Sequence, residues 1–219
     1  MRFLIQKIDK EIRHDFSFTL LESIRYQKWA SGDDADVQIK YLNRNANDEV
    51  WFFKPFHQHY IPIGSVEFVI SWFERFHDHT PLPINVPEEL WGFANRNIFN
   101  GDETFMKSMK GCGKWFVKSS DCIKGFKMVV EEDNELPKGR YQFSELTDIE
   151  SEWRAFVYQN RLVGLQNYNG DFTMFPDVSH INFMISQYKS APVAYTLDVG
   201  VFDDKTFVIE CHDFFSCGL

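Results

Sequence analysis

TLDVGVFDDKTFVIECHD, the stretch at residues 196–213, predicts a β-hairpin, because two β-rich runs flank an Asp-Asp turn signal. A three-residue loop at 203–205 gives the hairpin one wholly apolar face, made of Leu197, Val199, Val201, Phe207, Ile209 and Cys211. The opposite face then sets Asp198 across from Glu210. A two-residue loop would set Glu210 opposite Leu197 and leave neither face wholly apolar. Because a one-residue slip exchanges the two faces, burial of one side favours the three-residue loop.

The two carboxylates paired by this register, Asp198 and Glu210, lie about 5 Å apart at Cβ, where like charges repel. A cation between them relieves the repulsion, and oxygen ligands of this kind suit Mg²⁺. The pair is therefore a candidate magnesium site. The alternative is a solvated outer face whose charges point to water, since structural carboxylates also cluster.

The composition is that of a folded, acidic protein. Its 219 residues suffice for one large domain or two packed lobes, and 44% hydrophobic residues with 23 Phe can fill a sizeable core. The formal charge of −9 argues against a nucleic-acid-binding surface, which needs clustered Lys and Arg. A few lysines in a pocket remain compatible with a nucleotide.

The cysteines and the N-terminus predict a location. The four cysteines show neither a CxxC pair nor a secreted framework: Cys112, Cys122, Cys211 and Cys217. The first ten residues, MRFLIQKIDK, hold only a three-residue apolar run, and nothing approaches the length of a membrane span. We therefore expect a soluble, cytoplasmic protein with reduced thiols and no membrane partner.

The first part of the chain alternates strands and helices, which predicts a small α/β lobe. Strands are expected at 2–8, 38–42 and 50–53, and helices from Asp15 to Trp29 and after Ser65, which follows a turn at Pro62-Ile63-Gly64. TPLPINVPEEL then holds three of the eight prolines and marks a boundary. We place an N-terminal lobe at residues 1–85 and a second domain at 86–219.

The second domain is predicted to be richer in strands. We expect a short helix at 88–98, strands at 114–118, 126–132, 141–146, 153–158 and 161–167, a turn at Asn169-Gly170 and a helix at 177–188.

Several catalytic signatures are missing: GxxxxGK[ST], GxGxxG, GxSxG and HExxH. The pairs His57/His59 and His77/His79 lack a third ligand at metal spacing, so ordinary surface histidine is the favoured interpretation.

Two further motifs supply cations. In WFVKSSDCIKGF, Lys118 ends a strand ahead of a polar, glycine-containing turn, from which it can reach a phosphate, and Lys124 and Lys127 add charge. In SEWRAFV, Arg154 lies on a sheet face and can bind phosphate through two bonds. The alternatives are an exposed hairpin and a surface pair between Glu152 and Arg154. Together with the acids of the hairpin, these residues match the needs of an ATP–Mg²⁺ site.

Four segments, SEWRAFV, LVGLQNYNGD, AYTLDVGV and FVIECHDFF, resemble the ATP-grasp superfamily, and within it the clade named for one arginine and two lysines, found in bacteria and phages. The N-terminal IPIGSVEFV is also similar. The likeness covers most of the chain and is strongest from Lys114 onward. It implies an α+β protein with an ATP-grasp fold, in which two subdomains clasp ATP between antiparallel sheets, preceded by the α/β lobe.

The resemblance also implies roles for individual residues. Lys118 is the phosphate-binding lysine, Glu145 in YQFSEL belongs to the adenine-binding hinge, and Arg154 faces the transferred phosphoryl group. Asp198 and Glu210 match the Mg²⁺-binding acids. The usual ending Glu-x-Asn is here Glu210-Cys211-His212, so the third metal ligand is either His212, a poorer Mg²⁺ ligand, or Asp213. The second phosphate-binding lysine is Lys107, Lys124 or Lys127.

The implied activity is that of an ATP-dependent carboxylate–amine (or –thiol) ligase, which works through an acylphosphate and uses ATP and Mg²⁺. Its unknown substrates are a carboxylate and an amine, with amino acids, peptides and proteins all open. Two alternatives remain: a catalytically degenerate module that binds nucleotide or a protein, and an ATP-dependent phosphotransferase. The acceptor and the oligomeric state stay open.

Overall fold

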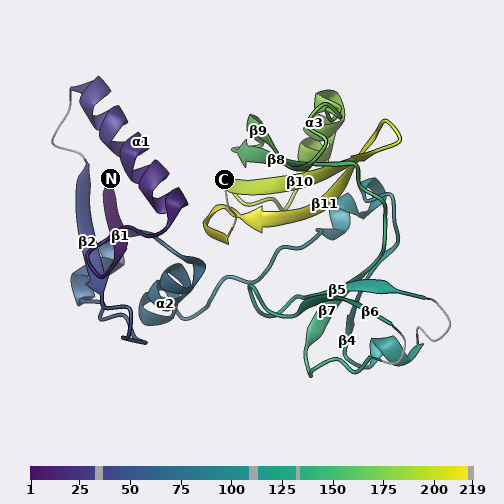
Figure 1. The fold of residues 1–219 in the computed structure, drawn as a ribbon, viewed down its shortest axis with the longest axis horizontal. Coiled ribbons are helices and arrows are strands. Elements are labelled where there is room, and N and C mark those ends of the chain that lie inside the picture. The colour runs from purple at the N-terminus through teal and green to yellow at the C-terminus, as the bar shows by residue number, and fades with distance from the viewer. Residues whose placement is uncertain (33–36, 109–112, 132–133, 217–219) are drawn as a thin grey trace. The chain divides into compact units, whose positions relative to one another are not determined.

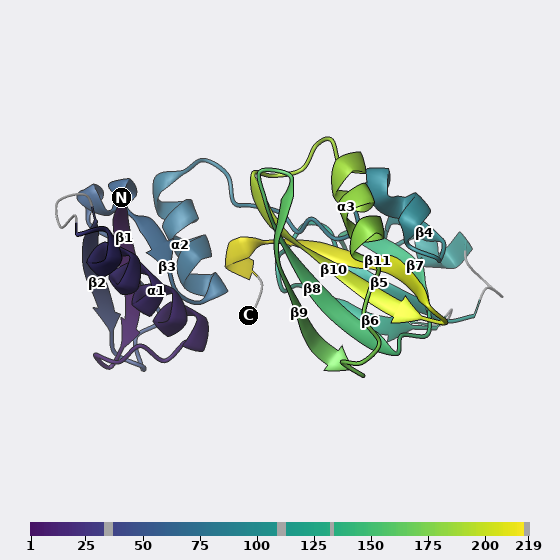
Figure 2. The same ribbon diagram turned by 90° about the horizontal axis from the view of Figure 1, so that it is seen from above.

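The computed structural model describes residues 1–32, 37–108, 113–131 and 134–216 (Figures 1 and 2). The described chain divides into two compact units, the first ending at Pro81 and the second beginning at Leu82. Each unit has its own sheets and its own core. Within the described residues, no helix combines the length and the apolar character needed to cross a lipid bilayer.

The first unit is an α/β lobe built on a parallel sheet of order β2-β1-β3. Its elements are β1 (Arg2–Ile8), α1 (Asp15–Ser31), β2 (Gln38–Arg44), the 3₁₀ helix η1 (Pro55–His59), β3 (Ile61–Ile63) and α2 (Val66–Phe76). A small core packs α1 onto the sheet through Ile5, Leu21, Ile24 and Ile63. Ser65 caps α2 as predicted, since its Oγ accepts a hydrogen bond from the Phe68 amide at 3.3 Å.

One predicted strand of this unit is wrong. Residues 50–53 form no strand, and the third strand is β3, where a turn was expected. Trp51 is buried from an irregular segment, with its ring 4.8 Å from that of Phe68, so packing rather than a sheet accounts for its apolar character. Pro62 is tolerated in β3 because an edge strand does not need every amide hydrogen.

The second unit contains two antiparallel four-stranded sheets. The first has the order β4-β7-β5-β6, with β4 (Ile98–Asp102), β5 (Trp115–Ser119), β6 (Lys127–Val130) and β7 (Arg140–Glu145). The second has the order β11-β10-β8-β9, with β8 (Ser151–Tyr158), β9 (Arg161–Gly170), β10 (Ala194–Phe202) and β11 (Lys205–Asp213). The helices are α3 (Val178–Gln187) and the 3₁₀ helices η2 (Glu88–Phe93), η3 (Phe105–Ser108) and η4 (Phe214–Ser216).

The main core lies on one face of the second sheet, the face that α3 covers (Figure 1). Strand β8 shows the alternation: Trp153, Ala155 and Val157 are buried in this core, while Glu152 and Arg154 take the other face. That other face is turned toward the first sheet, and it is therefore available for polar side chains.

Two further predictions for this unit are wrong. The expected helix at 88–98 is only the 3₁₀ turn η2, and the residues that follow enter β4, an unpredicted strand paired with β7. Asn169 and Gly170 do not form a turn but close β9. The turn between β8 and β9 is Gln159-Asn160, which adopts positive φ values of 49° and 55°, the geometry of a tight hairpin.

The β10–β11 hairpin confirms the predicted pairing of Asp198 with Glu210, but its turn is one residue shorter than predicted. Its turn has two residues, Asp203 and Asp204, with φ of 50° and 58°, so that Phe202 pairs with Lys205. The register then shifts next to Asp198, and Ile209 is the extra residue of a β-bulge. The bulge recovers the register that the predicted three-residue loop would have produced.

Candidate active site between the two sheets

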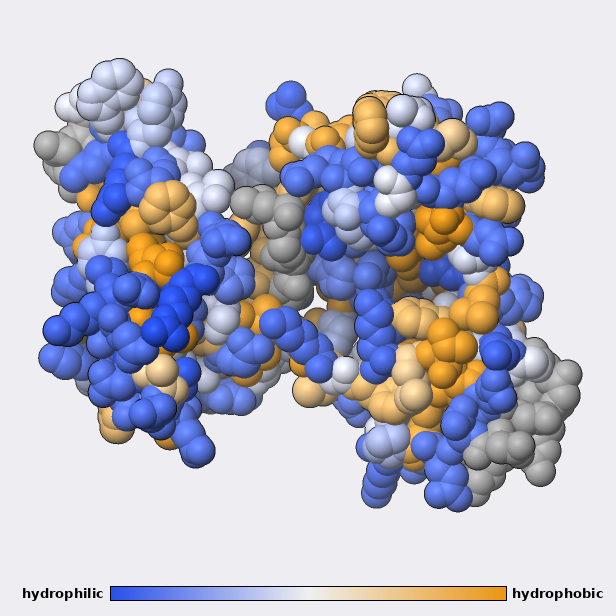
Figure 3. All heavy atoms as spheres, in the orientation of Figure 1, coloured by the Kyte–Doolittle hydropathy of each residue, from blue (hydrophilic) through white to orange (hydrophobic). Residues whose placement is uncertain are grey.

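Two adjoining cavities lie between the sheets of the second unit, about 330 Å³ and 370 Å³ in volume. Five residues line both of them: Asn85, Lys118, Lys127, Glu152 and Glu210. The space-filling view shows this unit hollowed between its upper and lower parts, with hydrophobic side chains beside the opening (Figure 3). All but one of the predicted site residues line these cavities, with Glu145 in the first and Lys118, Lys124, Arg154, Asp198, Glu210 and His212 in the second; the exception is Asp213.

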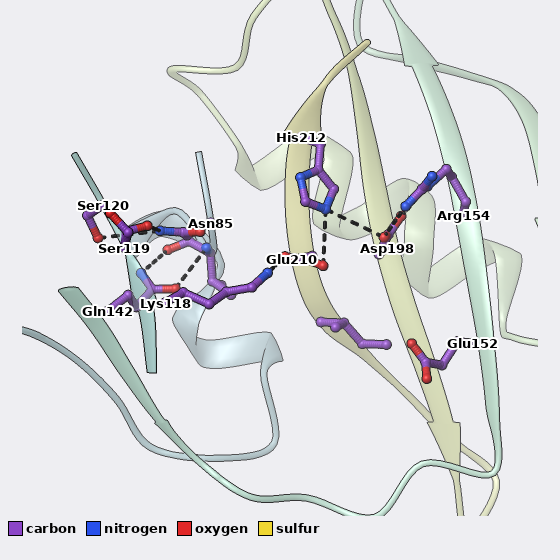
Figure 4. A network of polar contacts seen from close by, with 12 residues as sticks. Asn85, Lys118, Ser119, Ser120, Gln142, Glu152, Arg154, Asp198, Glu210 and His212 are labelled. Atoms are coloured by element: carbon purple, nitrogen blue, oxygen red, sulfur yellow. Dashed lines mark hydrogen bonds and ion pairs between the residues drawn. The ribbon is translucent and has the colours of Figure 1, made fainter. Parts of the chain in front are cut away.

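Asp198, Glu210 and His212 form a compact cluster on the cavity face of β10 and β11 (Figure 4). One ligand atom from each side chain lies within 4.8 Å of the other two. The His212 Nε2 atom is 3.0 Å from Glu210 Oε1 and 3.8 Å from Asp198 Oδ2. Two carboxylates and one imidazole are a donor set that fits a divalent cation.

Asp213 does not join this cluster. Side chains alternate along β11, so Asp213 follows Cys211 onto the opposite face from Glu210 and His212, and it pairs with Tyr195. Burial raises the pKa of Asp213, which makes a charged ligand less favourable there. Of the two alternatives for a third metal ligand, the structure brings His212 and not Asp213 to the site.

Each acid of the cluster contacts a cation. Arg154 binds Asp198 through two hydrogen bonds, Nε to Oδ1 at 2.9 Å and Nη2 to Oδ2 at 2.8 Å. Lys118 reaches from β5 across the cavity and pairs with Glu210 on β11 (Figure 4). The Arg154 guanidinium also lies over the Tyr168 ring, 5.1 Å from its centroid. Both carboxylates of the cluster thus have a cationic partner within the chain.

Burial shifts the ionisation of two of these groups. It lowers the pKa of Lys118 to about 7, with further lowering by Lys127 and Arg96, while Asp198 opposes the shift. The direct contact with the Glu210 carboxylate favours the charged ammonium and so opposes this lowering of the pKa. Burial also lowers the pKa of His212 to about 4, which leaves its imidazole neutral and able to bind a metal.

Among the three alternatives for the second lysine, Lys124 and Lys127 both line the cavity that holds Lys118 and Arg154. Lys127 lines the other cavity as well, and its Nζ lies over the Phe116 ring, 5.8 Å from the centroid. The side chain of Lys107 lies outside the described residues.

Glu145, the predicted hinge residue, is the last residue of β7, where it accepts hydrogen bonds from the amide and the side chain of Asn97, both at 2.9 Å.

Arg96 is a site residue that the sequence analysis missed. Its guanidinium donates to the carbonyl oxygens of Ala94 at 3.0 Å and of Val208 and Ile209, both at 2.8 Å. These last two carbonyls belong to the bulge that sets Glu210 opposite Asp198. Burial lowers the pKa of Arg96 to about 10. No spacing pattern marks this residue, because two of its three partners are backbone atoms more than a hundred positions away.

The segment around Asn85 was also missed, and it ties the two sheets together. The Asn85 carbonyl accepts from the Cys211 amide of β11 at 2.7 Å, and its Nδ2 donates to the Ser119 carbonyl of β5 at 3.0 Å. Gln142 of β7 bonds both the amide and the carbonyl of Val86 at 2.9 Å. Figure 4 shows Asn85 and Gln142 beside Lys118. This segment therefore fixes the two walls of the cleft.

Glu152 is held by the neighbouring strand. Its Oε2 accepts from the Tyr168 hydroxyl at 2.7 Å and its Oε1 from Asn169 Nδ2 at 2.6 Å. The earlier alternative of a surface pair between Glu152 and Arg154 is wrong, because Arg154 binds Asp198 instead.

The chain is similar to known proteins both in sequence family and in fold. The family model of the ATP-grasp domain, R2K clade family 2, matches residues 93–219, more than half of the chain. No protein with curated annotation matches significantly. Among solved structures, the chain is similar to N5-carboxyaminoimidazole synthetase from Staphylococcus aureus, with a TM-score of 0.57 and 9% identity over 97% of this chain and 71% of that one.

Two other solved structures agree. A RimK domain ATP-grasp protein from Sphaerobacter thermophilus gives a TM-score of 0.55 and 13% identity, over 98% of this chain and 92% of that one. D-alanine–D-alanine ligase from Bacillus anthracis gives a TM-score of 0.53 and 10% identity, over 97% of this chain and 86% of that one. These likenesses establish an α+β, ATP-grasp fold, as the sequence motifs predicted. The chain belongs to the ATP-grasp superfamily, in family 2 of its R2K clade.

Proposed function

We propose that the protein is an ATP-dependent ligase that joins a carboxylate to an amine or a thiol, with Mg-ATP bound between the two sheets of the second unit. The observation that carries the proposal is the meeting of Lys118 and Glu210. Lysine from one sheet and carboxylate from the other contact each other where the two cavities adjoin. Cations for phosphates and acids for a metal are the two needs of an ATP site.

The 330 Å³ cavity suits the nucleoside. Its wall combines apolar side chains with the end of β7, where Glu145 leads into the segment that joins the two sheets. The apolar members are Val86, Phe116, Leu146, Ile149 and Ile209. A flat base can pack against such a wall while backbone groups at its edge fix its orientation.

The 370 Å³ cavity suits the phosphates. Lys118, Lys124 and Lys127 line it together with Arg154. Three acids, Glu152, Asp198 and Glu210, line it as well, so the cations outnumber the acids by one and the cavity favours an anion. Asp198, Glu210 and His212 are the residues that would hold the divalent cation, which supplies positive charge to the phosphate oxygens when bound.

The chain's own residues then supply positioning and charge. The substrate carboxylate oxygen forms a bond to the γ-phosphorus while the bond to the β–γ bridging oxygen breaks, giving an acylphosphate and ADP. Lys118 and Arg154 are placed to stabilise the charge on the transferred group. The amine or thiol then bonds to the acyl carbon, phosphate leaves, and the nucleophile loses a proton. Arg154 must exchange part of its contact with Asp198 for a phosphate oxygen.

The test is a screen for ADP release with carboxylates, amines, amino acids and peptides, using protein with ATP and Mg²⁺. A substrate carboxylate labelled with ¹⁸O is expected to transfer one label to inorganic phosphate, the signature of an acylphosphate. Asp198→Asn should abolish the reaction. Asp204→Asn is the matched control, because Asp204 is an exposed turn residue whose φ of 58° asparagine also tolerates.

The alternatives give other results. Nucleotide binding without ADP release across the panel would favour a degenerate binding module. A stable phosphorylated product without amide or thioester would favour a phosphotransferase. Failure to bind nucleotide at all would refute the assignment of the cleft.

A further inference from the structure

The cation cluster contains one nitrogen donor, and this donor sets its chemistry apart from a site built of oxygens. His212 Nε2 lies 3.0 Å from Glu210 Oε1 and 3.8 Å from Asp198 Oδ2, a spacing from which all three side chains can reach one ion. Nothing else among the described His, Cys, Asp and Glu side chains groups in this way. The imidazole therefore belongs to the site and is not a bystander.

The position of His212 is fixed by the sheet. It lies on β11 directly across from Thr196 of β10, two residues from Glu210 on the same face. Its side chain is 26% exposed, against 1% for Asp198 and 12% for Glu210, so one side of the cluster stays open to an incoming ion.

The identity of the donor decides which ion the site prefers. Mg²⁺ is hard, demands octahedral geometry and favours oxygen ligands. Imidazole suits first-row transition ions, and carboxylates suit Mn²⁺ among them. We propose that the cluster of Asp198, Glu210 and His212 binds Mn²⁺ in preference to Mg²⁺, with His212 Nε2 as a direct ligand. The inference rests on the proposed function, because the ion is expected to bind together with the nucleotide.

The test uses purified protein with Mn²⁺ and a non-hydrolysable ATP analogue. Electron spin echo envelope modulation detects ¹⁴N bound directly to Mn²⁺, and we expect this coupling in the unmodified protein. Labelling the protein with ¹⁵N-histidine should replace it with a ¹⁵N coupling, which needs no variant. His212→Asn should abolish the coupling. His79→Asn, at an exposed histidine of the first unit, is the matched control and should keep it.

Calorimetry provides the second readout. The ratio of the Mg²⁺ to the Mn²⁺ dissociation constant is expected to fall about tenfold or more in His212→Asn, the usual size of the loss when a metal site's coordination is impaired. It should stay unchanged in His79→Asn. A bound Mn²⁺ without histidine coupling, or an unchanged ratio in His212→Asn, would overturn the inference and leave the nucleotide site intact. Absence of any binding of Mn²⁺ and nucleotide would overturn both.

Discussion

The guanidinium of Arg96 lies 2.8 Å from the carbonyl oxygen of Ile209, the residue that β11 inserts as a bulge. A bulge leaves backbone groups without their partners in the sheet ladder. Arg96 satisfies two of them, since it also bonds the Val208 carbonyl. The residue after the bulge is Glu210. Arg96 therefore connects the local backbone geometry of β11 to the position of a carboxylate in the cleft.

Replacement of Arg96 by Met should lower the free energy of unfolding by about 3 kcal/mol, because it leaves buried carbonyl oxygens without a donor. Urea unfolding of the second unit measures the loss. We also expect weaker Mn²⁺ binding, since Glu210 is no longer held opposite Asp198. Arg96→Lys keeps the charge but not the planar fork of donors, so it should recover only part of both losses. Full stability of Arg96→Met would contradict this account.

The ion pair between Arg154 and Asp198 allows a second test. Asp198 is fully buried, and Arg154 alone supplies two of its hydrogen bonds. Arg154→Met should therefore cost about 3–5 kcal/mol in the free energy of unfolding, the penalty for a buried charge that loses its partner. Adding Asp198→Asn should restore part of that loss. A double-mutant cycle measured by urea unfolding without metal gives the coupling, and additive effects would argue against the pair.

The sequence predicted the pairing that matters most for the site but not the path to it. Alternation of apolar residues is enough to place Asp198 opposite Glu210, because burial of one face of a sheet selects the register. The bulge at Ile209 could not be found in this way. A two-residue turn with a bulge and a three-residue loop without one give the same register at Asp198. They differ only between the turn and the bulge, where Phe202 pairs with Lys205.

Asp213 and β4 are a residue and a strand for which the sequence did not predict the observed structure. Asp213 lies three residues after Glu210, an odd number, so the alternation of side chains along a strand places the two on opposite faces. Asp213 was nevertheless a candidate ligand, because the end of the chain resembles the metal-binding motif of the family. Strand β4 was missed because its sequence, IFNGD, holds only two apolar residues. Its pairing with β7 depends on residues 38 to 46 positions away, and a local pattern cannot show that.

The first unit should lose stability in acid because of His57. This side chain is buried, its Nδ1 accepts a hydrogen bond from the Lys54 amide, and burial with nearby Lys40 and Lys54 lowers its pKa. The unfolded chain then binds more protons than the folded one at pH values just below 6.5, so the free energy of unfolding falls as the pH drops through that range.

The measurement is urea unfolding of the first unit between pH 5 and pH 7. His57→Phe should be less stable at pH 7, because it loses the acceptor for Lys54, but its stability should change less with pH. His79→Asn serves as the control with an exposed histidine and should keep the slope of the unmodified protein. An unchanged slope in His57→Phe would show that another group is responsible.

Gly170, at the end of β9, is a position where only glycine fits. Its φ is +75°, and a Cβ there would overlap the carbonyl oxygen of Glu150, a backbone atom that cannot move aside. Gly170→Ala should therefore lower the free energy of unfolding by more than about 2 kcal/mol. Gly164→Ala, on the same strand, is the control: its Cβ would meet only the Phe156 side chain, at 3.3 Å, and should cost less than about 1 kcal/mol. Equal losses in the two variants would show that the geometry at Gly170 is not what stabilises this end of the sheet.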